Sequence, residues 1–198
     1  RQRCRSAKSI GPFKMKWTSI KSEIATITLK KAAHDWSFVE LSSLVSDAQN
    51  CPLILYPNPI RNKIMKHVRE QNVELGGLLV GSIVSITDSV EEIIAIVVRD
   101  AMPSIDYESS AVSLTMSPRV WQSANSGLSD EMLVIGWYHS HPNLGAFFSC
   151  VDKKTQKDFF YNHYNLGLVI DPVRNEEKWY IGADADEIEE NRIRAFCF

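Results

Sequence analysis

A continuous apolar segment, Leu133–Tyr138 (LVIGWY), places the strongest constraint on how this chain can fold. A short apolar run with β-branched and aromatic side chains is typical of a buried strand. The run leads directly into His139-Ser140-His141-Pro142, where the proline ends the strand. A buried strand needs other strands beside it and helices over it, so this segment predicts a sheet at the centre of the molecule.

Hydrophobic periodicity and turn residues predict the remaining elements. We expect further strands over residues 23–29, 73–81, 92–98, 112–116, 166–170 and 178–182. We expect helices over residues 35–48, from Asn58 (with Pro59 in the first turn) to about 71–72, over 118–124 and over 152–161. Three prolines within residues 50–59 predict a turn or linker there. This mixture predicts an α+β fold, an α/β/α-like sandwich around a mixed central sheet flanked by helices. We expect residues 1–50 to form an N-terminal extension or small extra lobe, and residues 51–198 the main domain.

Composition limits the classes of function. The 198 residues are 44% hydrophobic and carry a net charge of −2, which suits one globular domain and excludes a wholly disordered chain. No overall basic field points to nucleic acid, and no apolar run reaches the ~18 residues of a membrane span. The four cysteines form no CxxC pair and no disulfide framework, so we expect a reducing, cytoplasmic location. The basic cluster Arg1–Arg5 is either a solvated tail or a contact for an acidic surface.

The segment that follows the central strand carries metal-ligand chemistry. His139 and His141 are two residues apart at a strand end, so both imidazoles point to the same side. Asp152 lies eleven residues later at a predicted helix start and can add an oxygen ligand. Two nitrogens and one carboxylate leave a fourth position open on zinc, as in catalytic zinc sites. Taken singly, Asp152 can be a helix cap and Ser149 a turn residue.

The full spacing resembles a known motif. His139-x-His141-Pro142-x-x-Gly145-x-x-x-Ser149-x-x-Asp152 is similar to the JAMM motif of the MPN+ (Mov34/PAD-type) zinc metalloproteases, a family with deubiquitinase, deneddylase and prokaryotic members. The resemblance extends over about residues 58–184. It includes Asp152–Gln156, Leu168–Pro172 and Glu74–Gly81, where a glutamate precedes a glycine-rich apolar run. It implies an MPN/cytidine-deaminase-like core.

The resemblance also implies a role for each motif residue. His139, His141 and Asp152 match the Zn²⁺ ligands. Glu74 matches the general base and acid that acts on the zinc-activated water, although by itself it can be an ordinary strand-edge carboxylate. Ser149 matches the residue that stabilises the oxyanion.

The implied activity is that of a zinc-dependent isopeptidase or peptidase. It would cleave a ubiquitin-like protein from a lysine or a C-terminal extension, with an activating protein partner as a further expectation. The alternative is an MPN scaffold that docks partner subunits and is active, if at all, only when a partner activates it. Phe147 and Phe148 can be core or substrate contacts, and we expect His34, His67 and His163 on the surface.

Overall fold

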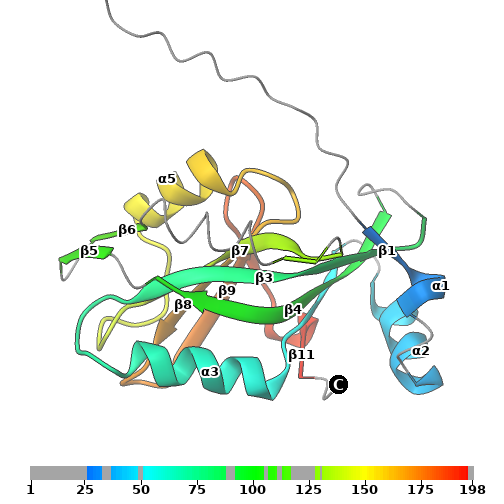
Figure 1. Cartoon of the computed structure of the whole chain (residues 1–198), viewed down its shortest axis with the longest axis horizontal. Helices are drawn as coiled ribbons and strands as arrows, with labels where there is room; N and C mark the ends of the chain where they lie inside the picture. The colour runs from blue at the N-terminus through cyan, green and yellow to red at the C-terminus, as the bar shows by residue number, and fades with distance from the viewer. Residues whose placement is uncertain are drawn as a thin grey trace, which may run out of the picture.

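A computed structural model describes residues 26–32, 37–48, 51–87, 92–104, 107–110, 113–116, 128–129 and 131–195 (Figure 1). Its main feature is a nine-stranded mixed sheet with the order β10-β9-β8-β7-β3-β4-β2-β11, in which β1 pairs with β3 beside this path. The strands are β1 (Thr26–Thr28), β2 (Leu53–Leu55), β3 (Gly76–Ser85), β4 (Ile93–Pro103), β7 (Leu133–Ser140), β8 (Leu166–Asp171), β9 (Glu176–Ile181), β10 (Asp186–Ile188) and β11 (Ile193–Arg194). Strands β5 (Tyr107–Ser110) and β6 (Ser113–Met116) form a separate antiparallel pair.

The helices cover both faces of the sheet. They are α1 (Leu29–Ala32), α2 (Phe38–Asp47), α3 (Asn58–Val68), α5 (Cys150–Phe159) and the 3₁₀ turn η2 (Glu190–Arg192). Figure 1 shows α5 and α3 on opposite sides of the central strands. This arrangement confirms the predicted α+β fold with a mixed sheet flanked by helices.

Alternation along the strands divides the core between the two faces. On one face, Ile64 and Val68 of α3 pack in a cluster with Ile54 and Ile96. On the other face, the neighbouring strand residues pack with Leu44 of α2 in a second cluster. A third cluster joins Trp137, Phe148 and Phe160 near α5. The central strands are therefore buried on both sides, as the apolar run in β7 predicts.

The connection between β7 and β8 brings the motif residues to one end of the sheet. These two strands are parallel, so the chain must cross back over the sheet between them, and α5 lies in that crossover. The loop and the first turn of α5 consequently lie beside the carboxyl end of β7. In contrast, β3 is antiparallel to both β7 and β4.

Several element boundaries differ from the sequence-based expectations. The predicted turn over residues 50–59 contains β2, because its prolines lie outside the three-residue strand that pairs with β4 and β11. Helix α3 ends at Val68, earlier than predicted, and its N-cap is Pro57 rather than Asn58. Strand β3 begins at Gly76 and runs to Ser85, which leaves Glu74 ahead of the strand. The helix predicted over 118–124 lies outside the described residues.

Part of the N-terminal region is built into the same sheet. Strand β1 pairs in parallel with the end of β3, and Leu44 of α2 is fully buried. Helix α2 begins with a capping box between Ser37 and Glu40. The domain boundary at residues 50–51 remains a prediction. Within the described residues, no helix is long and apolar enough to cross a membrane.

Candidate metal centre

Strand β7 and the residue that follows it bring two imidazoles together. His139 belongs to β7 and is 1% exposed, and His141 is the first residue after the strand. The backbone N–H of His141 donates to the carbonyl of Ile170 on β8 at 2.8 Å, which prolongs the extended conformation past the strand end. The two Nε2 atoms are 3.2 Å apart. The expectation that both side chains point to the same side is confirmed.

Helix α5 brings a carboxylate to the same point through its N-terminal cap. Ser149 is the N-cap: its Oγ accepts from the backbone N–H of Asp152 at 3.2 Å, and its own N–H donates to Asp152 Oδ2 at 2.7 Å. This capping box orients the Asp152 carboxylate. Oδ1 then lies 3.3 Å from His139 Nε2, and Oδ2 lies 3.6 Å from His141 Nε2. The helix cap is thus Ser149, which the sequence analysis treated as a turn residue, and Asp152 closes the capping box while it contacts both imidazoles.

The donor set fits a zinc ion. One ligand atom from each of His139, His141 and Asp152 lies within 4.8 Å of the others, and all three residues are buried. Two imidazole nitrogens and a carboxylate oxygen are ligands that zinc prefers, and a three-residue set leaves a further position open.

The protonation states of two of these residues suit metal binding. Burial and the neighbouring His139 lower the pKa of His141, so its imidazole is neutral at pH 7 and able to bind a cation. Burial raises the pKa of Asp152, but the contact with His139 and the hydrogen bonds from Ser149 outweigh it and hold that pKa at about 2. Asp152 is therefore ionised throughout the physiological range.

Glu74 reaches this group from outside the strand in which the sequence placed it. Next to it, the Leu75 carbonyl accepts from the backbone N–H of Ser140 at 2.8 Å, and the Leu75 N–H donates to Ser140 Oγ at 3.0 Å. These bonds hold residues 74–75 against the end of β7. Glu74 Oε1 lies 3.6 Å from His141 Nε2, and the Glu74 side chain is 6% exposed. Burial raises the pKa of Glu74.

A buried ring stack and a hydrogen bond hold the His139 imidazole in place. The Trp137 ring stacks on the His139 ring with centroids 4.5 Å apart and planes 9° apart. The Trp137 indole N–H donates to Gln156 Oε1 at 2.7 Å. Gln156 lies one helical turn after Asp152 on α5, so the same helix positions both the carboxylate and the ring behind His139. The four-residue spacing of Asp152 and Gln156 indicates, from sequence alone, that both side chains lie on the same face of the helix.

Asp171 holds the loop that carries His141, a role that sequence reasoning missed. Its buried carboxylate accepts backbone N–H groups of the loop and of the turn after β8. These donors are Asn143 (3.0 Å), Gly145 (2.7 Å), Val173 (2.9 Å) and Arg174 (3.1 Å). Gly145 has φ 91°, a left-handed conformation that glycine adopts without strain, so it permits the tight loop that follows His141.

The other aromatic and histidine expectations have mixed outcomes. Phe148 is buried in the core, whereas Phe147 is 47% exposed with its ring centroid 5.1 Å from that of His141. The surface prediction for His67 is wrong, because α3 packs it against Tyr138, whose hydroxyl lies 2.9 Å from His67 Nδ1. His163 is exposed as expected. His34 lies outside the described residues.

Comparison with known proteins identifies similar chains. The family model described as JAB1/Mov34/MPN/PAD-1 ubiquitin protease matches residues 57–165. The ubiquitin carboxyl-terminal hydrolase RPN11 of Saccharomyces cerevisiae is 30% identical over 116 residues, covering 57% of this chain and 36% of RPN11. COP9 signalosome complex subunit 5 of Candida glabrata is 25% identical over 150 residues, covering 70% of this chain and 32% of that subunit. The chain thus spans about a third of the length of these relatives.

A solved structure shares the fold. The solution structure of protein DSY2949 from Desulfitobacterium hafniense superposes with a TM-score of 0.56 at 22% identity, covering 73% of this chain and 93% of that one. At this identity the likeness concerns the fold alone.

Proposed function

The chain belongs to the JAB1/Mov34/MPN/PAD-1 ubiquitin protease family, and from this membership we propose that it is a zinc-dependent isopeptidase that releases a ubiquitin-like protein from a lysine side chain or from a C-terminal extension. One observation carries the proposal. The ligand atoms of His139, His141 and Asp152 converge, and the Glu74 carboxylate lies 3.6 Å from His141 Nε2. A family member that had lost its metal would have no need to keep all four residues together.

His139, His141 and Asp152 would hold Zn²⁺. When bound, the ion supplies Lewis acidity, which polarises the scissile carbonyl and makes a water molecule easier to deprotonate. The chain's own contribution begins with the state of its ligands. A neutral His141 and an ionised Asp152 present lone pairs without first losing protons.

Glu74 would carry the proton transfers. As general base it takes a proton from the attacking water, and as general acid it returns that proton to the leaving lysine amine. The second transfer is essential because an amide anion is a poor leaving group. Burial raises the pKa of Glu74, which helps the carboxyl group to retain the proton between the two transfers.

Ser149 would stabilise the charge that develops on the substrate oxygen. Its hydroxyl oxygen already accepts the N–H of Asp152, and a hydroxyl that accepts one hydrogen bond can still donate another. The helix cap holds this hydroxyl at the start of α5, beside the metal ligand Asp152. Removing one such donor typically lowers turnover by ~10²–10³.

The names of the relatives support a proposal for the substrate and for a partner. A ubiquitin-like substrate agrees with the name of RPN11 as a ubiquitin carboxyl-terminal hydrolase, and the name of the signalosome relative places that protein in a multi-subunit complex. This second name supports the alternative, in which the chain is a scaffold that docks partner subunits and is active, if at all, only when a partner activates it.

Two measurements on matched variants test the proposal. Zinc content is determined by mass spectrometry, and cleavage is followed with ubiquitin-like fusions and lysine-linked conjugates. The test variant is Glu74→Gln. The control is Glu70→Gln, which changes an exposed glutamate that also precedes β3. We expect one zinc per chain in all three proteins, and cleavage reduced by ~10²-fold or more only in Glu74→Gln.

The other outcomes separate the alternatives. A protein that retains no zinc would refute the ligand assignment. Zinc retention without cleavage of any substrate would favour the docking module, and cleavage that survives Glu74→Gln would remove Glu74 from the proposed mechanism.

A further inference from the structure

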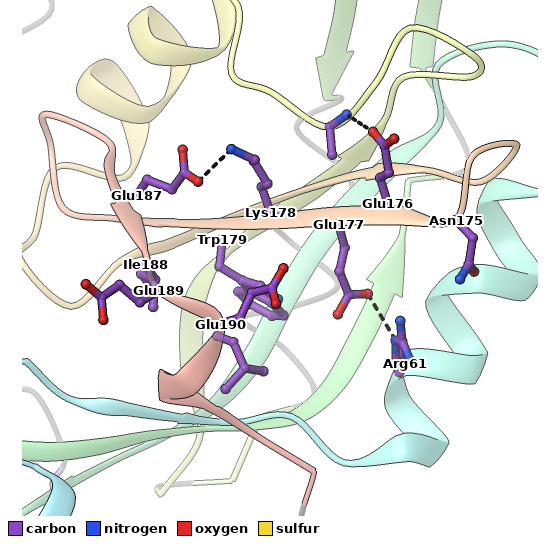
Figure 2. A pocket seen from close by; sticks show the side chains of 12 residues that line it. Arg61, Asn175, Glu176, Glu177, Lys178, Trp179, Glu187, Ile188, Glu189 and Glu190 are labelled. Carbon is purple, nitrogen blue, oxygen red and sulfur yellow. Dashed lines mark hydrogen bonds and ion pairs between the residues drawn. The ribbon is translucent and has the colours of Figure 1, made fainter.

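A pocket separate from the metal-ligand group lies along β9, near β10 and η2, and it is strongly acidic. Its volume is about 540 Å³. Five glutamates line it: Glu176, Glu177, Glu187, Glu189 and Glu190 (Figure 2). None of these residues belongs to the metal-ligand group.

Ion pairs within the pocket leave an excess of negative charge. Arg61 Nε lies 3.0 Å from Glu177 Oε2, and Lys178 Nζ lies 2.6 Å from Glu187 Oε1. These two pairs use both cations of the pocket lining, and they leave Glu176, Glu189 and Glu190 without a cation from the lining. With two cations against five carboxylates, the pocket has a formal charge of −3 and favours a ligand with several positive charges.

The pocket also presents an unused hydrogen-bond donor. Trp179 lines it and is 2% exposed, and in the described part of the chain its indole Nε1 has no hydrogen-bond partner. Figure 2 shows Trp179 between the side chains of Glu177 and Glu189. A buried N–H without an acceptor is costly, so the ligand should bring an acceptor as well as positive charge.

The strand edge at this pocket is open. Residues 179–181 of β9 pair with β10, but within the described residues no strand pairs with Glu176–Lys178 on the side away from β8. An open edge accepts an extended peptide, whose carbonyl groups supply hydrogen-bond acceptors. An extended peptide rich in lysine and arginine would therefore satisfy the charge, the indole donor and the strand edge together.

The chain itself contains such a segment. Residues 1–22 include seven lysines and arginines and no acidic residue, which leaves a formal charge of −9 on residues 23–198. Arg1, Arg3 and Arg5 alternate with other residues, so in an extended conformation their side chains share one face. A tethered segment also has a high effective concentration at its own pocket.

We propose that the acidic pocket on β9 binds the chain's own basic segment, residues 1–22, as an extended peptide. Its cationic side chains pair with Glu176, Glu189 and Glu190, and one of its carbonyl groups accepts from Trp179 Nε1. Glu176 Oε2 also accepts from the backbone N–H of Ala146 at 3.4 Å, so the docked segment would lie next to the loop between His141 and Ser149.

Limited trypsin digestion of the 198-residue chain tests the docking, because bound lysines and arginines are protected. The pocket variant is Glu189→Gln/Glu190→Gln. The matched control is Asp184→Asn/Asp186→Asn, which removes the same charge from exposed positions outside the pocket lining. We expect cleavage after Arg5 and Lys8 to be about fivefold faster in the pocket variant than in wild type, and unchanged in the control. Equal rates in all three proteins, or an equal increase in both variants, would overturn the proposal.

Zero-length carbodiimide cross-linking identifies the contact and its origin. The reagent joins a lysine amine to a carboxylate that it touches, and peptide mass spectrometry locates the amide. We expect links from Lys8, Lys14 or Lys16 to the pocket glutamates in the monomer fraction. Links confined to cross-linked dimers would assign the segment to a second copy and overturn binding within one chain. Links only to carboxylates elsewhere would overturn the pocket itself.

Discussion

Substitution of Asp171 by asparagine should loosen the loop that carries His141 without changing the size of the side chain. The Asp171 carboxylate is 0% exposed and accepts four backbone N–H groups from two segments. Asparagine keeps one oxygen, which can serve the three donors at Oδ1. Its amide group then faces the N–H of Gly145, so two donors oppose each other where a 2.7 Å hydrogen bond existed.

The expected loss of stability follows from these contacts. A hydrogen bond to a charged group contributes about 1.5–3 kcal/mol, and a buried donor without a partner costs about 1–3 kcal/mol. One such bond is lost, and the three that remain go to a neutral acceptor. We expect the free energy of unfolding to fall by about 2–4 kcal/mol at pH 7.

Urea unfolding of the metal-free protein measures this loss, with Asp186→Asn as the control at an exposed position. Burial raises the pKa of Asp171, but the N–H groups of Arg174, Gly145, Asn143 and Val173 outweigh it and lower that pKa. The stability from Asp171 is therefore present above the unfolded pKa of about 3.9 and is lost as the pH falls through the lower folded pKa.

The difference between Asp171→Asn and wild type should thus shrink below about pH 4. Zinc affinity, measured by chelator competition, should fall by about 10–100-fold, because the loop also positions His141. A loss below about 0.5 kcal/mol at pH 7 with unchanged zinc affinity would refute the reasoning, since this is the size of an ordinary surface substitution.

Three further substitutions have defined expectations. Gln156→Leu should lower the free energy of unfolding by about 2–4 kcal/mol in urea titrations, and it should weaken zinc binding. The reason is that the Trp137 indole loses its acceptor, and three backbone carbonyls lose the donor at Gln156 Nε2. Glu74→Gln should raise the Tm of the metal-free protein at pH 7, because burial raises the pKa of Glu74 and its charged form is therefore disfavoured in the folded state. The gain should vanish in scans near pH 4, where both states hold the proton. Gly167→Ala should cost about 1–3 kcal/mol, because its Cβ would lie 2.4 Å from Phe148 Cζ, and an unchanged Tm would show that the ring moves freely.

Local pattern was sufficient where neighbours in the sequence are also neighbours in space. The two-residue spacing of His139 and His141 determines a shared side because side chains alternate along a strand. The capping box of Ser149 and Asp152 is likewise a local device, and it orients the carboxylate within one helical turn. The apolar run in β7 similarly predicted a buried central strand.

Local pattern failed where a partner comes from a distant segment. Strand β2 is only three residues long between prolines, and it forms because β4 and β11 supply its hydrogen bonds. His67 is buried because α3 packs against Tyr138, which is 71 residues away in the chain. His67 was expected on the surface because it belongs to no motif, and no local signal in the sequence reports such packing.

By itself the sequence determined the α+β class, the family, and the chemical type and spacing of the His139, His141 and Asp152 group. Tertiary structure alone decided that Glu74 approaches this group from outside β3, that Asp171 holds the His141 loop, and that acidic residues gather beside an edge of β9 that no described strand covers. The physical reason is that alternation and helix capping act between near neighbours, whereas strand pairing and burial join residues whose separation along the chain carries no periodic signal.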